Sequence, residues 1–217
     1  MKKHIVCLGD SNTHGSCPNL LDCEDGLPRF NENERWTCRL QKALGTDYLV
    51  LEDGLSGRTM TCPDPLTEGI PALDVIYPIL MTHEPVDLLI IMLGTNDTKD
   101  RFGLNAPCIA KCMERLLNKA KSVPCWGTKK PNILVICPPH IRPEMLTAPI
   151  ADVMGQTCVE KSQQLAKYME PIVTGMGFAF MDAEGIGEMN TVDFMHLSRA
   201  AHAALAEKLA KIVPSLV

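Results

Sequence analysis

One stretch limits the possible folds of this chain more than any other. Residues 86–93, Val-Asp-Leu-Leu-Ile-Ile-Met-Leu, are almost continuously apolar. Such a run is typical of a parallel strand covered on both faces, because a solvated face would show alternating polar residues. Shorter apolar runs indicate four more strands, at 4–9, 48–52, 132–137 and 178–181. The segments between them show helical spacing of apolar residues, over 35–44, 71–83, 107–121, 153–169 and 197–213.

This alternation of strands and helices predicts an α/β protein with a parallel sheet and right-handed crossover connections. We expect a three-layer α/β/α sandwich of the flavodoxin-like type, whose five strands lie in the order 2-1-3-4-5. That order brings together the carboxyl ends of the first three strands, where open α/β sheets bind ligands. The chain contains no internal repeat and no linker composition, so we expect residues 1–217 to form a single domain.

Charge and hydropathy exclude two classes of partner. A net charge of −5 and a pI near 5.7 argue against a nucleic-acid-binding protein, which would carry a basic face. No apolar run is long enough to cross a bilayer, so no association with membranes is expected. The first strand begins within a few residues of Met1 and leaves no room for a signal peptide, which predicts a cytoplasmic protein.

The ten cysteines are scattered over predicted strands, helices and loops, and no C-x-x-C pair occurs. Cys108 and Cys112 have no second pair of Cys or His that would complete a zinc site, so no metal is expected. In a cytoplasmic protein these residues are predicted to be reduced thiols. The alternative, a disulfide framework, is typical of secreted chains.

Polar or small residues stand where the predicted strands end. Ser11 follows the first strand, Gly57 the second and Asn96 the third. Asp193 and His196 form a further cluster just before the last helix. These residue types are the ones that acyl transfer through serine requires: a nucleophile, a base, a group that orients the base, and donors to the developing oxyanion.

The sequence therefore predicts a role for each residue. Ser11 would attack, His196 would serve as general base and then general acid, and Asp193 would orient the imidazole. The oxyanion hole would consist of the backbone N–H groups of Ser11 and Gly57 and the side-chain amide of Asn96. Each residue also has a structural alternative: Ser11 as a helix cap, Gly57 as a turn glycine, Asn96 in an Asx-turn, and Asp193 and His196 in the first turn of a helix. The combination favours the catalytic interpretation.

Four sequence blocks carry a resemblance to a known family. They are Gly9-Asp10-Ser11-Asn12, Gly57, Gly94-Thr95-Asn96-Asp97 and Asp193-x-x-His196. In this order, spread over almost the whole chain, they resemble the SGNH (GDSL-type) hydrolases, and the fold expected is therefore the SGNH hydrolase fold. The segments 54–59 and 91–99 resemble the bacterial arylesterase and acyltransferase subgroup. The resemblance implies the same Ser, Gly, Asn and His roles.

Two positions differ from that subgroup. Asn12 stands where leucine is usual, and His14 stands where the subgroup tends to have an aromatic residue. Both differences predict a more polar entrance to the active site. The resemblance also implies a homo-oligomer in which loops from neighbouring copies shape the active-site channel; the long loops at 16–33 and 140–150 are the candidates here.

The function expected is that of a serine esterase that cleaves short-chain acyl esters through a Ser11 acyl-enzyme, with acyl transfer to alcohols as a side reaction. It would need no cofactor, and its partner would be a small-molecule ester. A carbohydrate O-acetyl esterase is the alternative within the same chemistry. A flavodoxin-like module that binds a small ligand without catalysis is the alternative from another class, and it would predict a phosphate-binding glycine loop, none of whose patterns occurs.

Overall fold

A computed structural model describes residues 2–68 and 71–217 of the chain. Five strands form one sheet in the order β2-β1-β3-β4-β5, and every neighbouring pair is parallel. The predicted fold class and strand order are confirmed. The strands are β1 (Lys3–Gly9), β2 (Tyr48–Gly54), β3 (Leu88–Met92), β4 (Ile133–Cys137) and β5 (Ala179–Asp182).

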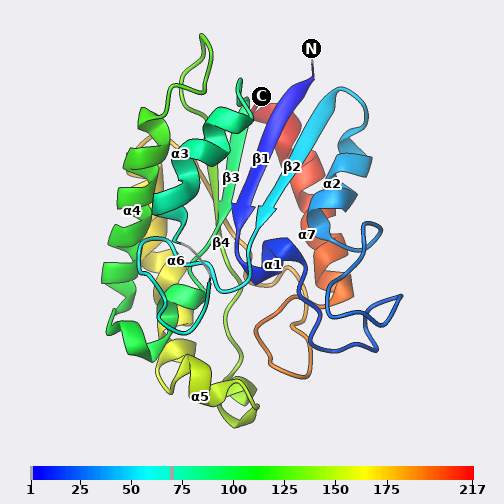
Figure 1. The fold of residues 1–217 in the computed structure, drawn as a ribbon, viewed down its shortest axis with the longest axis vertical. Helices are drawn as coiled ribbons and strands as arrows, with labels where there is room; N and C mark the ends of the chain where they lie inside the picture. The colour runs from blue at the N-terminus through cyan, green and yellow to red at the C-terminus, as the bar shows by residue number, and fades with distance from the viewer. Residues whose placement is uncertain (1, 69–70) are drawn as a thin grey trace.

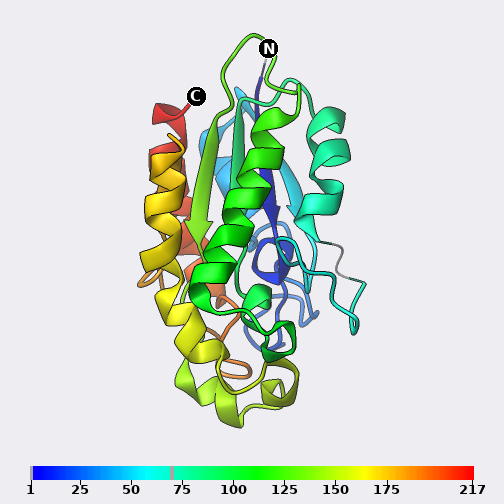
Figure 2. The same cartoon turned by 90° about the vertical axis from the view of Figure 1, so that its left-hand side faces the viewer.

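Helices cover both faces of the sheet, which explains why its central strands are apolar throughout (Figures 1 and 2). The helices α2 (Trp36–Leu44) and α7 (Arg199–Ile212) pack together on one face. The other face carries α3 (Ala72–Thr82), α4 (Ala106–Ser122) and α6 (Cys158–Gly175). The chain therefore forms the expected three layers, with one hydrophobic core on each side of the sheet.

Short helical segments follow the carboxyl ends of the strands. These are α1 (Ser11–His14) after β1, the 3-10 helices η1 (Asn96–Thr98) and η2 (Asp100–Phe102) after β3, and η3 (Pro143–Thr147) and α5 (Ala151–Met154) after β4. A final 3-10 helix, η4 (Val213–Ser215), ends the chain at the opposite edge, near the N-terminus (Figure 1).

The predicted helix over 153–169 was wrong in its bounds, because two helices occupy this region and the longer one runs further. The carboxylate of Asp100 accepts hydrogen bonds from the backbone N–H groups of Gln156 (2.7 Å) and Thr157 (3.2 Å), which separates α5 from α6. Helix α6 then continues through Pro171 to Gly175, because packing on the sheet outweighs the lost hydrogen bond. The connection between β4 and β5 thus contains more helix than the sequence indicated.

Among the described residues, no helix is both long and apolar enough to cross a membrane. Within the same residues, no group of three or more His, Cys, Asp or Glu side chains could hold a metal ion.

The register of the sheet sets where the functional loops begin. Gly9 pairs with Gly54 on one side and with Met92 on the other, so β1, β2 and β3 end level with one another. A side chain at Gly54 would lie 2.2 Å from the backbone nitrogen of His14, and one at Gly9 would lie 2.0 Å from Thr13 Oγ1. Only glycine at these two positions lets α1 sit directly on the strand ends.

Candidate active site

Ser11 is the first residue of α1 and lies at the carboxyl edge of the sheet. The carboxylate of Asp10 caps this single turn by accepting a hydrogen bond from Asn12 N (3.0 Å). Gly15, in the left-handed conformation, ends it. Strand and turn together hold the Ser11 side chain in a site that leaves the residue only 8% exposed.

His196 joins Ser11 to Asp193. Its Nε2 atom lies 2.7 Å from Ser11 Oγ, and its Nδ1 atom lies 2.6 Å from Asp193 Oδ2. Burial alone would raise the pKa of Asp193, but the hydrogen bond and the charge of His196 lower it to about 2. Asp193 is therefore ionised at neutral pH, and its carboxylate favours the imidazole tautomer that carries its proton on Nδ1. In that tautomer Nε2 is free to accept the hydroxyl proton of Ser11.

The turn that carries Asp193 and His196 is held by its own side chains. Asp193 Oδ1 accepts from the backbone N–H groups of Met195 and His196, both at 3.1 Å. The side chain of Asn190 donates to Asp193 Oδ1 (2.6 Å) and to the carbonyl of His196 (3.0 Å). Phe194, the residue after Asp193, has a φ of 60°, a rare value for a residue with a side chain. Such a conformation persists only where surrounding contacts fix it.

Two of the residues expected in the oxyanion hole lie at the same edge of the sheet. Gly57 belongs to the turn after β2, and Leu55 N in that turn donates to the carbonyl of Gly9 at 3.1 Å. Asn96 is the first residue of η1, and its Nδ2 donates to Asp10 Oδ2 at 3.4 Å. A carboxamide nitrogen carries two hydrogens, so one remains for a substrate oxygen. The N–H of Ser11, at the start of a helix, has no intrahelical acceptor.

Asp10 and Asp97 brace this edge rather than line the site. Both are fully buried, and burial raises the pKa of Asp10 to about 6 and that of Asp97 to about 7. Asp10 contacts Asn12 and Asn96 as described, and Asp97 Oδ1 accepts a hydrogen bond from Met60 N (2.9 Å).

The prediction that Asn12 makes the entrance more polar was wrong. Asn12 is only 2% exposed, and its carboxamide forms hydrogen bonds inside the protein. Its Nδ2 donates to the carbonyl of Met195 (3.3 Å), and its Oδ1 accepts from Leu197 N (2.8 Å). His14 is half-buried next to the Gly54 backbone; burial and the nearby Arg29 lower the pKa of its ring.

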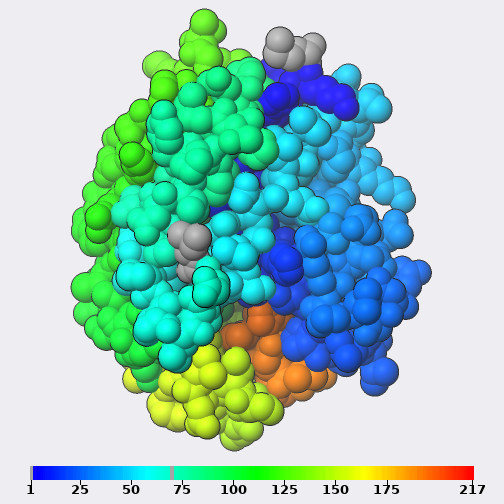
Figure 3. All heavy atoms as spheres, viewed as in Figure 1, coloured from blue at the N-terminus to red at the C-terminus, as the bar shows by residue number. Residues whose placement is uncertain are grey.

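Sequence reasoning also missed a buried ion cluster that fixes the loop after Gly57. The carboxylate of Asp64 binds Lys99 Nζ (2.8 Å) and Arg101 Nη2 (2.7 Å), and these partners hold its pKa well below the usual range. The cluster ties the loop after β2 to the 3-10 helices after β3. In Figure 3 this cyan loop meets the dark blue start of the chain and the orange segment before α7.

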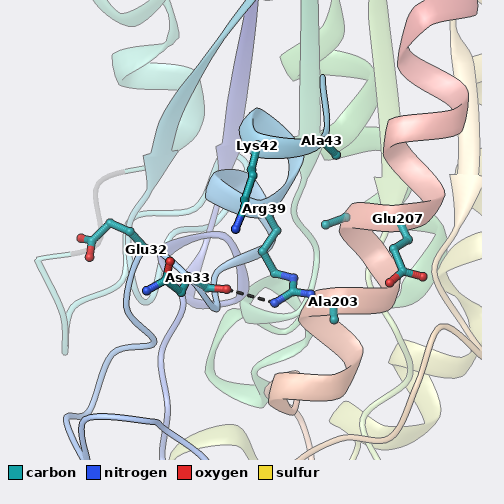
Figure 4. A pocket seen from close by; sticks show the side chains of 8 residues that line it. Glu32, Asn33, Arg39, Lys42, Ala43, Ala203 and Glu207 are labelled. Atoms are coloured by element: carbon teal, nitrogen blue, oxygen red, sulfur yellow. Dashed lines mark hydrogen bonds between the residues drawn. The ribbon is translucent and has the colours of Figure 1, made fainter. Parts of the chain in front are cut away.

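A separate pocket lies between α2 and α7, away from Ser11. Arg39 and Lys42 contribute positive charge to it, and Glu32 and Glu207 contribute negative charge (Figure 4). Arg39 donates to the carbonyl of Asn33 at 3.0 Å. None of the predicted site residues lines this pocket.

The sequence profile of the GDSL-like lipase/acylhydrolase family matches residues 7–204. The chain belongs to this family. Its members are hydrolases of acyl esters, and the expectation of a carboxylic ester hydrolase is confirmed. The alternative of a non-catalytic module is set aside. Among curated proteins, no sequence matches this GDSL-like hydrolase.

Solved structures of esterases are similar over the full length of this hydrolase. An aryl esterase from M. smegmatis superposes with a TM-score of 0.88 at 35% identity, over 99% of this chain and 100% of that one. A carbohydrate acetylesterase from Sinorhizobium meliloti superposes with a TM-score of 0.87 at 30% identity, over 100% of both chains. A member of the lipolytic G-D-S-L family from Veillonella parvula, at 14% identity and a TM-score of 0.67, shares the fold.

Proposed function

We propose that this hydrolase cleaves short-chain acyl esters through a covalent intermediate on Ser11. The observation that carries the proposal is the chain of short contacts from Ser11 Oγ to His196 Nε2 and from His196 Nδ1 to Asp193 Oδ2, at 2.7 Å and 2.6 Å. A serine, an imidazole and an ionised carboxylate in this order are what an activated hydroxyl nucleophile requires.

The first half-reaction forms the acyl-enzyme. Ser11 Oγ attacks the ester carbonyl carbon while His196 Nε2 takes the hydroxyl proton, and the carbonyl electron pair moves onto oxygen. The N–H groups of Ser11 and Gly57 and the carboxamide of Asn96 donate to this oxyanion. Collapse of the tetrahedral intermediate breaks the bond to the alcohol, which leaves with the proton from His196. Asp193 stays ionised and stabilises the imidazolium.

The second half-reaction releases the acid. Water, deprotonated by His196, attacks the acyl carbon, and Ser11 Oγ leaves and recovers its proton. An alcohol in place of water gives acyl transfer by the same steps. No step requires a metal or an organic cofactor.

Two ester classes compete as substrates. Simple aryl or alkyl esters are supported by the similarity to an aryl esterase. Acetylated sugars are supported by the similarity to a carbohydrate acetylesterase and by a polar feature beside the site. Ser16 Oγ lies 3.0 Å from Ser56 Oγ, so a pair of exposed hydroxyl groups sits next to Gly57. Such groups suit a hydroxylated alcohol moiety.

The test compares the wild type with Ser11→Ala on p-nitrophenyl acetate, p-nitrophenyl butyrate and a panel of acetylated sugars. The variant should lose activity on every substrate while keeping the fold, as judged by circular dichroism. Equal activity of variant and wild type would refute the nucleophile assignment. A higher kcat/KM on acetylated sugars than on the p-nitrophenyl esters would establish the carbohydrate esterase.

We further propose a homo-oligomer in which copies meet at the loops around the site. Among the described residues, exposed large apolar side chains lie on the loops and on α5, and they are Leu20, Leu21, Leu27, Leu55, Leu66, Val153 and Val192. Apolar residues gathered on one edge of a protein often mark an interface. Light scattering at micromolar concentration tests the proposal, and a monomer would refute it.

We also propose that this hydrolase is cytoplasmic and forms a single domain. The ten cysteines are free, a state that a reducing compartment maintains, and this supports a cytoplasmic location. The N-terminal and C-terminal elements share one sheet and its cores, which supports one domain over residues 1–217. Limited proteolysis that released a stable half of the chain would contradict a single domain.

A further inference from the structure

Asn12 stands next to the proposed nucleophile, yet its side chain is buried in the protein. Its two polar atoms bind the backbone on both sides of His196: Nδ2 donates to the carbonyl of Met195 at 3.3 Å, and Oδ1 accepts from Leu197 N at 2.8 Å. The residue is 2% exposed, so solvent does not compete for these hydrogen bonds. One side chain thus binds the segment that carries the proposed base at two points.

We propose that Asn12 is a positioning residue that sets the distance between Ser11 and His196. The inference rests on the proposed function, since it concerns how that pair is aligned. Ser11 and Asn12 are consecutive residues of α1, and Met195 to Leu197 are consecutive residues around His196. Two hydrogen bonds between these short segments fix their relative position, and with it the 2.7 Å contact of Ser11 Oγ with His196 Nε2.

Other contacts fix the position of His196 relative to Asp193 or to the segment after β4, not relative to Ser11. Asn190 and Asp193 hold the turn internally and so align His196 with Asp193, not with Ser11. Met195 packs with Ile141, Met145 and Met154, which anchors the turn to the segment after β4. Among the described residues, the Asn12 bonds are the only hydrogen bonds, besides the Ser11–His196 contact itself, that join α1 to residues 189–198.

Substitution by leucine, the usual residue in the family, keeps the volume but removes both hydrogen bonds. The carbonyl of Met195 and the N–H of Leu197 then lose their partners, and the segment is free to shift relative to α1. A displacement of about 1 Å in a reacting pair lowers turnover by about 100-fold. Because the Asn12 side chain is buried, binding should change little.

The experiment measures kcat and KM on p-nitrophenyl acetate, together with the thermal unfolding midpoint, for Asn12→Leu and a matched control. The control is Asn132→Leu, which removes a carboxamide that donates to the carbonyls of Asp87 (2.9 Å) and Leu216 (2.6 Å) at the opposite edge of the sheet. We expect N12L to lose about 100-fold in kcat with KM unchanged within about twofold. N132L should lower the unfolding midpoint and keep the wild-type kcat.

A second variant covers the case in which N12L does not fold. Asn12→Asp keeps an oxygen for Leu197 N but turns a carboxylate oxygen toward the carbonyl of Met195, so a hydrogen bond is replaced by a repulsive contact and kcat should fall by at least about tenfold. Its KM should again stay near the wild-type value.

Ser11→Ala, measured in parallel, separates the two levels of the argument. If S11A is inactive while N12L and N12D keep the kcat of N132L, the positioning role is refuted and the proposed function stands. If S11A retains wild-type activity, the proposed function fails and the inference falls with it.

Discussion

Replacing Asp193 by asparagine should disable the base without moving it. The Oδ1 atom of Asp193 accepts three hydrogen bonds within the turn, from Asn190 Nδ2, Met195 N and His196 N. In D193N the amide oxygen can keep these three, so the amide nitrogen must take the place of Oδ2 and face His196 Nδ1. Nδ1 then has to accept a hydrogen bond, and the ring proton moves to Nε2. A protonated Nε2 cannot take the proton of Ser11.

The size of the effect follows from losing the correct tautomer while the geometry persists. In serine hydrolases of other folds this loss costs about 10⁴-fold in kcat, which corresponds to about 5.5 kcal/mol of transition-state stabilisation. We expect the same order in D193N, with KM within a few-fold of the wild type. Steady-state kinetics on p-nitrophenyl acetate measures it. The matched control is Asp182→Asn at the end of β5, whose carboxylate accepts a hydrogen bond from the backbone N–H of Glu184 at 2.9 Å.

The same substitution changes how stability depends on pH. The pKa of Asp193 is lowered from 3.8 to about 2 in the folded protein, so its ionised form stabilises the fold above about pH 4. This contribution, at most about 2 kcal/mol and reduced by the water that reaches the site, is lost as pH falls from about 4 to about 2. Unfolding free energies of D193N should therefore vary less over that interval than those of the wild type.

For the kinetic prediction, a kcat of D193N within tenfold of the wild type would refute the assignment of Asp193.

Three further substitutions test the proposed oxyanion hole and the buried groups around the site. Asn96→Ala removes an oxyanion donor and should lower kcat by about 10²- to 10³-fold with KM little changed; an unchanged kcat would remove Asn96 from the oxyanion hole. Asp97 has a pKa raised to about 7 by burial, so folding takes up a proton and stability falls as pH rises from about 4 to about 7. Asp97→Asn should weaken that pH dependence of the unfolding midpoint, and an identical slope in both proteins would argue against a protonated Asp97. Asp64→Ala leaves Lys99 and Arg101 without their shared partner and should cost about 3–5 kcal/mol in denaturant unfolding; a loss below about 1 kcal/mol would mean that the cluster does not stabilise the loop.

The sheet could be predicted from sequence because its signal is local. The apolar runs of the strands need burial on both faces, and each is followed by a helix that supplies it. The break between α5 and α6 could be predicted only in part. Gly155, with a φ of 91°, ends α5 and is a local signal, but the start of α6 depends on Asp100, more than fifty residues away, whose carboxylate accepts hydrogen bonds from the N–H groups of Gln156 and Thr157. Sequence periodicity contains no information about such a distant cap.

The same distinction holds at the site. Ser11, Gly57, Asn96, Asp193 and His196 could be named because their residue types are tied to the chemistry, and the structure places all five at one edge of the sheet.

The roles of the residues that support the site, Asn12 and Asn190, were not predicted, for a physical reason. The carboxamide of Asn12 bonds to backbone 183 and 185 residues away, and nothing in its neighbourhood reveals that partner. The role of Asn190 was easier to predict from sequence. Asparagine is common in Asx-turns, and its side-chain oxygen here accepts a hydrogen bond from the backbone N–H of Asp193. A polar side chain beside a proposed catalytic residue can thus be buried and structural where sequence alone suggests that it lines the pocket.

Covalent labelling of Ser11 tests the central claim most directly. Wild-type protein treated with a fluorophosphonate and digested should carry one phosphonyl group, on the peptide that contains Ser11, with activity lost in step. His196→Ala should label far more slowly, because the hydroxyl lacks its base. Labelling of another residue, or folded protein that hydrolyses esters with Ser11 unmodified, would contradict the account.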